Sequence, residues 1–347
     1  MRIFILSVLT LVLAVEGINA GSWQNVTQES EPGLAGNEIQ FIQSGQEKGE
    51  LWVGTLTGIS RVRGGKFAVL TDAKGKPLDY KTWMVLEFGP DKYWIGHDMG
   101  VSMWDGKNEA TALNDFRLAM MFKVQEDTVW ALAQNRNSEK KVLYIYHAGT
   151  WEPIKETASK QVVDLFQDKS GKFWISLDGD GVLEVDPIAG FDKAVHHLRG
   201  LNVTAIAEFQ AGRIWCGLWS RGIRVWDGVS WREHLSKEKK SAILNMVQDQ
   251  QGNMWVATND NGIWRKPYNE DVWTNDLSDK GGITMLASTR DGRVWVSSQA
   301  EGGLYYWDKT KWVASLENQL PIRCMLETSG GQLWAGGIMD GLYLNKD

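Results

Sequence analysis

Residues that could do chemistry are spread thinly along this chain, in short polar segments that follow apolar runs. The sequence has five His, and none has a metal-ligand spacing such as two His four residues apart with a carboxylate partner. It also has no nucleophile elbow and no phosphate-binding loop. The pattern therefore predicts no catalytic residue, no metal site and no cofactor.

The polar segments instead offer side chains that a structural scaffold does not require. These candidate ligand-binding residues follow an apolar run that carries a Trp, and they are His97, Asp98, Arg136, Asp178, Asp180, Trp219, Arg221, Asp260, Glu301 and Asp340. Trp219 is the best single candidate, because its ring beside the Arg221 guanidinium could stack on a sugar or hold a carboxylate. For any one of these residues, an ordinary solvated loop side chain is the simpler interpretation, and Trp219 can equally pack over the next blade.

Two further groups lie close to these candidates. Asp178 and Asp180 share one segment and could bind a hard cation together with nearby carbonyls, although one such pair is a weak signal. Trp83, near Tyr80 and Lys81, could line the same site or be buried.

A repeated unit positions these segments, and residues 291–312, DGRVWVSSQAEGGLYYWDKTKW, show it most clearly. A tight turn, an apolar run with a Trp, a polar loop ending in Gly and a second apolar run predict consecutive antiparallel strands. The aligned Trp recurs at intervals of 36 to 44 residues, at Trp52, Trp94, Trp130, Trp174, Trp215, Trp255, Trp295 and Trp334. Eight copies of four short strands are typical of a β-propeller.

Each copy is expected to contribute one blade to an all-β, eight-bladed propeller of four-stranded antiparallel blades. First strands are expected over 38–43, 82–88, 117–123, 161–167, 203–209, 242–248, 283–289 and 322–328. The second strand carries the aligned Trp, which we expect to pack between blades because an aromatic ring buries a large area. The third strand begins after a Gly in seven copies, and the fourth often opens with a second Trp.

The two ends of the chain are expected to meet in the last blade. Copy eight ends after its third strand, whereas residues 21–24, GSWQ, match residues 228–232, GVSWR, at the start of a fourth strand. A strand near Trp23 is therefore expected to complete the last blade, which leaves no unpaired edge between the first and last blades.

The first twenty residues are expected to be a separate segment. Arg2, an apolar run over 3–15 and the small residue Ala20 are typical of a secretory signal peptide, and the run is too short to span a bilayer. The alternative is an uncleaved anchor. We therefore expect a signal peptide over 1–20, one propeller over 21–347, no membrane span in the mature chain, and a periplasmic or secreted location. Cys216 and Cys324 are expected to be buried free thiols.

Charge excludes one class of partner. The net charge is −6 and the pI is about 5.5, whereas nucleic-acid binding needs a basic surface. No nucleic-acid partner is predicted.

With the turn, the Trp run and the Gly in view, the chain resembles the two-component regulator propeller repeat. The matching segments include DQQGNMWVATNDNGIWRKP, QAGRIWCGLWSRGIRVWDG and TRDGRVWVSSQAEGGLYYWD. The resemblance implies an extracytoplasmic sensor-type propeller, of a kind often thought to recognise saccharides. We expect no transmembrane helix or kinase domain after the propeller, which departs from the usual arrangement.

Two functions follow as hypotheses. The first is an exported, non-catalytic propeller that binds a saccharide, another small ligand or a protein partner on its loop face. The alternative is a polysaccharide lyase or glycoside hydrolase with its site at the channel mouth. There His97 or a nearby Tyr could act as a base, and Arg136 could neutralise a uronate carboxylate. Loops gathered on a rigid scaffold are the default place for either site.

Overall fold

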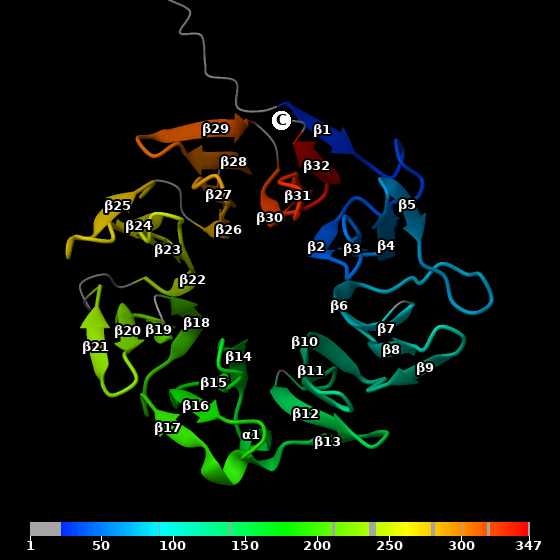
Figure 1. Ribbon diagram of the computed structural model, residues 1–347, viewed down its shortest axis with the longest axis horizontal. Coiled ribbons are helices and arrows are strands. Elements are labelled where there is room, and N and C mark those ends of the chain that lie inside the picture. The colour runs from blue at the N-terminus through cyan, green and yellow to red at the C-terminus, as the bar shows by residue number, and fades with distance from the viewer. Residues whose placement is uncertain are drawn as a thin grey trace, which may run out of the picture.

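In a computed structural model, the chain forms a closed ring of eight four-stranded antiparallel sheets around a central channel (Figure 1). The structure describes residues 22–89, 91–138, 140–209, 212–235, 241–278, 282–300, 302–317 and 320–345. The expected eight-bladed β-propeller is confirmed. The predicted signal peptide lies outside the described residues.

Within each blade the strands follow one another outward from the channel (Figure 1). The inner strands are β2 (Ile39–Ser44), β6 (Thr82–Gly89), β10 (Phe116–Gln125), β14 (Val162–Gln167), β18 (Val203–Phe209), β22 (Ile243–Gln248), β26 (Ile283–Ser288) and β30 (Ile322–Glu327). The second strands are β3 (Leu51–Thr55), β7 (Lys92–His97), β11 (Thr128–Asn135), β15 (Phe173–Leu177), β19 (Arg213–Leu218), β23 (Met254–Thr258), β27 (Val294–Ser298) and β31 (Leu333–Gly337).

The outer half of each blade consists of the third and fourth strands. The third strands are β4 (Gly58–Arg63), β8 (Gly100–Trp104), β12 (Lys141–His147), β16 (Val182–Val185), β20 (Ile223–Trp226), β24 (Ile263–Lys266), β28 (Gly302–Trp307) and β32 (Leu342–Asn345). The outer strands are β5 (Lys66–Val69), β9 (Glu109–Ala112), β13 (Thr150–Pro153), β17 (Val195–His197), β21 (Trp231–His234), β25 (Thr274–Asp276), β29 (Trp312–Leu316) and β1 (Trp23–Val26). A single helical turn, α1 (Lys155–Ala158), and a 3₁₀ turn, η1 (Phe191–Lys193), lie beside blades 3 and 4.

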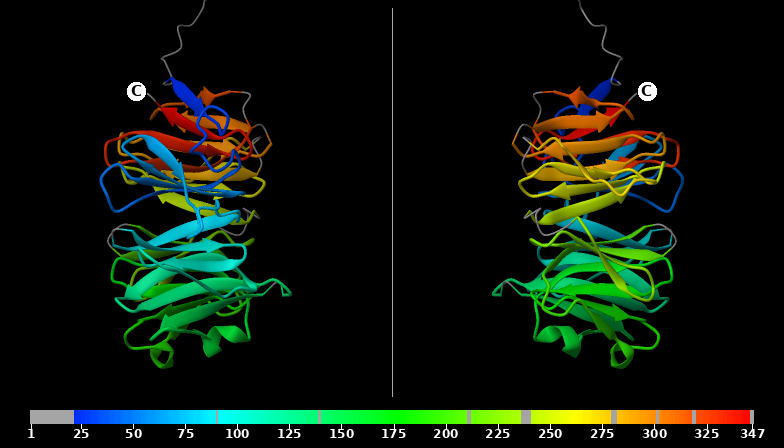
Figure 2. Two further views of the ribbon diagram at one scale, coloured as in Figure 1. Left: turned by 90° about the vertical axis from the view of Figure 1, so that its right-hand side faces the viewer. Right: turned by 90° about the vertical axis from the view of Figure 1, so that its left-hand side faces the viewer.

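Blades are numbered 1 to 8 from β2–β5 onward, so blade 8 combines β30, β31 and β32 with β1. All inner strands begin within one residue of their expected places. Seen from the edge, the strands run between two faces (Figure 2). The loop face carries the connections between second and third strands and between blades. The opposite turn face carries the turns between first and second strands and between third and fourth strands.

The N-terminal strand closes the ring as expected. β1 pairs with β32 in a register that sets Trp23 opposite Asn345 and Asn25 opposite Tyr343. The Trp23 indole N–H donates a hydrogen bond to Ser315 Oγ at 2.9 Å, and its ring meets Trp295 edge-on with centroids 5.9 Å apart. The first strand of the chain therefore completes blade 8 and packs against blade 7.

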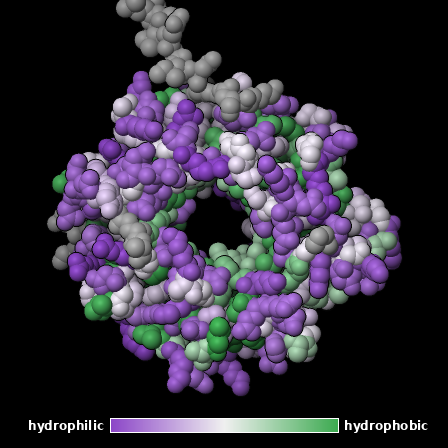
Figure 3. Space-filling model, viewed as in Figure 1, coloured by the Kyte–Doolittle hydropathy of each residue, from purple (hydrophilic) through white to green (hydrophobic). Residues whose placement is uncertain are grey.

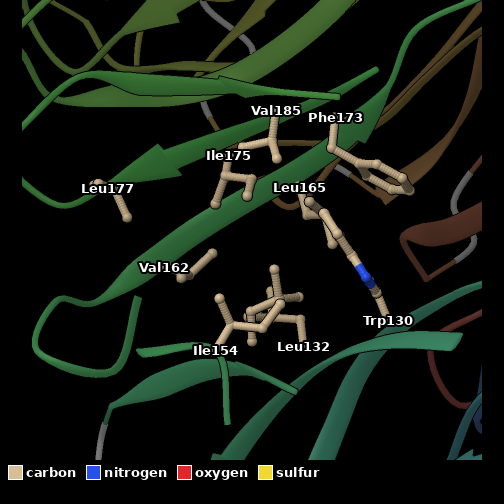
Figure 4. Close-up of a cluster of buried hydrophobic side chains, with 10 residues drawn as sticks. Trp130, Leu132, Ile154, Val162, Leu165, Phe173, Ile175, Leu177 and Val185 are labelled. Atoms are coloured by element: carbon tan, nitrogen blue, oxygen red, sulfur yellow. The ribbon is translucent and has the colours of Figure 1, made fainter. Parts of the chain in front are cut away.

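The core of the described chain is divided among the interfaces between neighbouring blades, here called seams. Eight clusters of buried hydrophobic residues fill the eight seams. Figure 4 shows one of them, where Trp130 and Leu132 of blade 3 face Leu165 and Phe173 of blade 4. Each of the eight aligned Trp side chains is buried, as predicted for residues that pack between blades.

The Gly before the third strand is required by its backbone conformation. Gly222 and Gly262 have φ of 68° and 61°, a region that disfavours side chains. A Cβ at these positions would lie 1.4 Å from the Leu235 carbonyl oxygen and 2.1 Å from that of Leu277. The outer strand therefore approaches the hairpin too closely for any other residue.

Candidate functional site

A repeated backbone hydrogen bond brings the predicted loop residues to one face of the ring. In every blade the loop after the second strand donates an N–H to the carbonyl of the residue that leads into the inner strand. The pairs are Leu56–Glu38, Asp98–Lys81, Arg136–Asp115, Asp178–Gln161, Trp219–Asn202, Asn259–Ala242, Gln299–Gly282 and Ile338–Pro321. The loop face is therefore a ring of similar loops that carry different side chains.

His97 lies inside blade 2 beneath this face. Its side chain is 3% exposed and stacks on Tyr80 with ring centroids 4.4 Å apart. Its Nδ1 accepts a hydrogen bond from the Met99 backbone N–H at 3.1 Å, and its Nε2 lies 3.1 Å from Ser102 Oγ. Burial lowers the pKa of His97 to about 4. This arrangement gives His97 a structural role in the hairpin and no direct access to a ligand.

Asp98 and Arg136 lie together across the seam between blades 2 and 3. The Arg136 Nε donates a hydrogen bond to the Asp98 carbonyl oxygen at 3.2 Å, and its Nη2 lies 3.8 Å from Asp98 Oδ2. Both side chains are partly exposed. Arg136 therefore has a carboxylate neighbour already, which offsets the charge that it could offer to an anion.

Asp178 and Asp180 share the loop of blade 4, but they have different surroundings. Asp178 is exposed. Asp180 forms an ion pair with Lys160, and its backbone oxygen contacts the His196 ring. The hydrogen bond from Lys160 lowers the pKa of Asp180. The structure therefore does not bring the two carboxylates together as a pair free for a cation.

The remaining acidic candidates are dispersed around the face. Asp260 is exposed on blade 6. Asp340 accepts a hydrogen bond from the Tyr343 hydroxyl at 2.6 Å, and burial of that hydroxyl raises the pKa of Tyr343. Glu301 lies outside the described residues. In the part of the chain that the structure describes, no three His, Cys, Asp or Glu residues form a group that could hold a metal ion.

Trp219 is the most exposed aromatic candidate on the loop face. Its side chain is 61% exposed, and Arg221 beside it is exposed as well. Trp219 and Arg221 border a cavity of about 180 Å³ together with Leu201 and Asn202. The Asn202 Oδ1 accepts a hydrogen bond from the Gly179 N–H of blade 4 at 2.7 Å. The cavity lies between residues 200–202 and 218–221, two segments that the backbone hydrogen bond from Trp219 N–H to the Asn202 carbonyl joins at 3.0 Å.

The inner strands contribute residues that loop positions alone did not suggest. Every inner strand has a register shift near its start, on the loop-face side. Such a bulge reorients a side chain, and exposed side chains on an innermost edge strand face the channel. Leu244 and Arg323 are exposed there, and Trp83 is half-buried with Lys81 Nζ 4.5 Å from its ring centroid. Figure 3 shows the open channel and hydrophobic residues along part of its wall.

Two further expectations concern thiols and membranes. Cys216 and Cys324 are both free, the first buried and the second half-buried. Burial raises the pKa of Cys324 to about 12. None of the helices in the described ranges is long and apolar enough to cross a bilayer.

Comparison with known proteins finds one sequence family, which matches a single blade of the chain. The sequence model of the two-component regulator propeller family matches residues 238–260, which include β22 and β23 of blade 6. This segment therefore matches the two-component regulator propeller repeat that the sequence resembles. No curated protein matches the chain.

Solved structures share the propeller fold at low sequence identity. The computationally designed Ika8 protein has a TM-score of 0.61 and 13% identity, over 89% of this chain and 96% of its own. YCF48 bound to D1 peptide has a TM-score of 0.54 and 14% identity, over 93% and 96%.

A third similar structure is the extracellular domain of the putative one component system BT4673 from B. thetaiotaomicron. It has a TM-score of 0.52 and 13% identity, over 91% of this chain and 51% of its own. The chain thus spans about half the length of that domain. At these identities the likeness shows the fold alone.

Proposed function

We propose that this protein is an exported, non-catalytic propeller that binds a saccharide or a protein partner on its loop face. Trp219 carries the proposal, because an aromatic ring that is 61% exposed next to the Arg221 guanidinium lies over a small cavity. A large exposed aromatic residue gives a binding surface at low conformational cost, and a guanidinium pairs with carboxylates in a fixed geometry. The propeller scaffold itself does not need either side chain.

The fold neighbours support a binding role in general terms. One is an extracellular domain of a putative one component system, and another binds a peptide. Saccharide binding rests on the chemistry of Trp219 and Arg221 alone. The lyase alternative receives less support, because His97 is enclosed in the hairpin and Arg136 lies next to Asp98.

A glycan panel with two variants tests this proposal. The secreted protein is incubated with immobilised acidic and neutral oligosaccharides, and both binding and newly formed reducing or unsaturated ends are measured. Trp219→Ala should weaken binding at least ten-fold without changing the melting temperature, because the ring is a surface residue. Val229→Ala serves as the matched control, since Val229 is 86% exposed in a turn of the opposite face.

Retained affinity in Trp219→Ala for a glycan that binds the wild type would remove this residue from the site. New chain ends in the wild-type reaction would favour the enzyme instead. If no glycan binds, a pull-down with a protein partner using the same two variants tests the remaining half of the proposal.

A further inference from the structure

A cavity of about 290 Å³ opens on the turn face, at the seam between blades 2 and 3. Its walls include Phe88, Trp94 and Met103 of blade 2 and Tyr146 of blade 3. Phe88 and Tyr146 both pack against Trp94, with ring centroids 4.8 Å apart in each pair. The rim carries the exposed carboxylates of Asp105, Glu126 and Asp127 and one exposed ammonium group, that of Lys92, so that acidic side chains outnumber basic ones. The cavity is therefore an aromatic corner with an acidic rim, remote from the loop-face candidates.

The corresponding place in the seam between blades 1 and 2 is occupied by an arginine of the chain itself. Arg61 lies directly opposite Trp52 in the register of the second and third strands. Its guanidinium carbon is 4.7 Å from the Trp52 ring centroid, and its Nη1 contacts Asp91 Oδ1 at 2.7 Å. The hydrogen bond from Arg61 lowers the pKa of Asp91, which is in the first turn of blade 2.

The seam between blades 6 and 7 has the same arrangement of an arginine packed on the aligned Trp. Arg265 lies opposite Trp255 in the same register position. Its guanidinium carbon is 4.6 Å from the Trp307 centroid and 5.5 Å from the Trp255 centroid. A guanidinium within about 6 Å of an aromatic face gains a cation–π attraction. In two seams of the ring, a guanidinium therefore packs against the aligned Trp.

Blade 2 has the same aromatic corner and lacks the arginine. The residue opposite Trp94 is Met103. Tyr146 lies opposite Val129 in blade 3, as Trp307 lies opposite Val294 in blade 7.

The carboxylate is also in place. Asp127 precedes Trp130 by three residues, as Asp91 precedes Trp94. No ion pair joins Asp127 to any described residue. The seam therefore has the aromatic wall and the carboxylate of a guanidinium site, with an open cavity beside them.

We propose that this cavity binds a guanidinium group from outside the chain, either an arginine side chain of a peptide or a small guanidine. The aromatic rings attract the planar cation, and Asp127 pairs with it at the rim. The volume is at the lower end of the range for ligand pockets, roughly 300–1,000 Å³, so a compact head group fits better than an extended ligand. The neighbouring seam between blades 3 and 4 differs, because Phe191 stacks on Trp130 there at 5.4 Å.

A pair of probes that differ in charge tests the site. Titration calorimetry of the full chain compares n-butylguanidinium with n-butylurea, which has a similar planar head and no charge. The guanidinium should bind with a millimolar dissociation constant, and the urea should bind at least five-fold more weakly. A Gly-Arg-Gly amide peptide that competes for the same site with higher affinity would identify a peptide as the source of the group. Tighter binding of n-butylguanidinium would identify a small guanidine.

Two variants locate the site. Met103→Arg supplies the missing guanidinium from within the chain and should abolish binding of the probe. Met339→Arg is the matched control, because Met339 is exposed on the loop face, and it should leave the affinity unchanged. Asp127→Asn should weaken binding about three- to five-fold, as expected for a solvent-exposed charge pair. Asp127 is a surface residue, so this variant still tests the site if Met103→Arg fails to fold.

Equal affinities for the guanidinium and the urea would overturn the proposal, as would undiminished binding in a folded Met103→Arg variant. Trp219→Ala separates this site from the loop-face function. It should leave guanidinium binding unchanged, so a failure of either proposal can be recognised without the other.

Discussion

Blades 2 and 6 have the same four strands and carry the aligned Trp in the same position. They differ in the turn before this Trp, which among the described residues provides a hydrogen-bond acceptor for the indole N–H in blade 6 only. In blade 6 the Asp249 carboxylate accepts the indole N–H of Trp255 at 2.8 Å and a backbone N–H from Asn253 at 2.9 Å. The corresponding turn of blade 2 is shorter, so no Asp occupies that place beside Trp94. The family match also falls on blade 6.

The difference extends to the other side of the blade. Blade 6 has Arg265 and Thr258 where blade 2 has Met103 and His97. Because each blade contacts mainly its two neighbours, a departure from the repeat changes only its own seam. The comparison shows that the ring can stay closed although one blade has a smaller side chain at a seam position. In blade 2 that smaller side chain leaves a cavity.

The largest expected effect distinguishes the two seam Trp residues. Trp255→Ala should lower the free energy of unfolding by about 3–5 kcal/mol, the usual cost of deleting a fully buried aromatic side chain. Trp94→Ala should cost at least about 1 kcal/mol less, because part of its surroundings is already an empty cavity that makes no contacts. Urea unfolding of both variants measures the difference.

Trp255→Phe and Trp94→Phe are the matched controls for this comparison. They keep an aromatic ring and remove the indole N–H, which in Trp255 donates to Asp249 and in Trp94 has no acceptor among the described residues. Trp255→Phe should therefore be the more destabilising of the two. Equal losses for the two alanine variants would mean that the cavity beside Trp94 is not a defect in packing.

The second prediction concerns the pH dependence of the free energy of unfolding. Burial lowers the pKa of His97 to about 4 from its ordinary value of 6.5. The unfolded chain therefore binds this proton first, and the stability contributed by neutral His97 is lost as the pH falls from about 6.5 to about 4. One pKa unit corresponds to 1.36 kcal/mol, so the full loss is on the order of 3 kcal/mol.

His97→Thr tests this sign directly by giving blade 2 the residue of blade 6. Thr258 performs the same local task there, because its Oγ accepts the Asn261 N–H at 3.1 Å and donates to the Gly262 carbonyl at 2.9 Å. Urea midpoints at pH 7 and pH 4.5 should differ less in His97→Thr than in the wild type. A pH dependence that is the same in both proteins would show that His97 does not titrate in this range on unfolding.

Most of the architecture could be predicted from the sequence, because a period of about forty residues fixes strands, turns and blade number together. The match between the segment around Trp23 and that around Trp231 also predicted which strand closes the ring. Pairing in β1 confirmed this, with Trp23 opposite Asn345.

The site was less accessible to sequence reasoning. Placing the loops on one face followed from strand alternation, but the enclosure of His97 did not, because it depends on the ring of Tyr80 and the hydroxyl of Ser102. The cavity at the seam of blades 2 and 3 was missed. The cavity forms where blade 2 has Met103 in place of an arginine. This replacement is recognised only from the strand register, which sets Met103 opposite Trp94 as Arg265 is opposite Trp255.

The smallest expected effect exchanges the residues at this register position. Arg265→Met removes a partly buried guanidinium from two indole rings and should destabilise the fold by about 1 kcal/mol. Met103→Arg should stabilise it by about 0.5 kcal/mol, less than the first loss because the corner beside Asp127 is more open to solvent. Urea unfolding of the two variants and of the double exchange measures both values. The seams are far apart in the ring, so their effects should add, and a destabilising Met103→Arg would mean that the corner of blade 2 has the residues of a guanidinium site without its geometry.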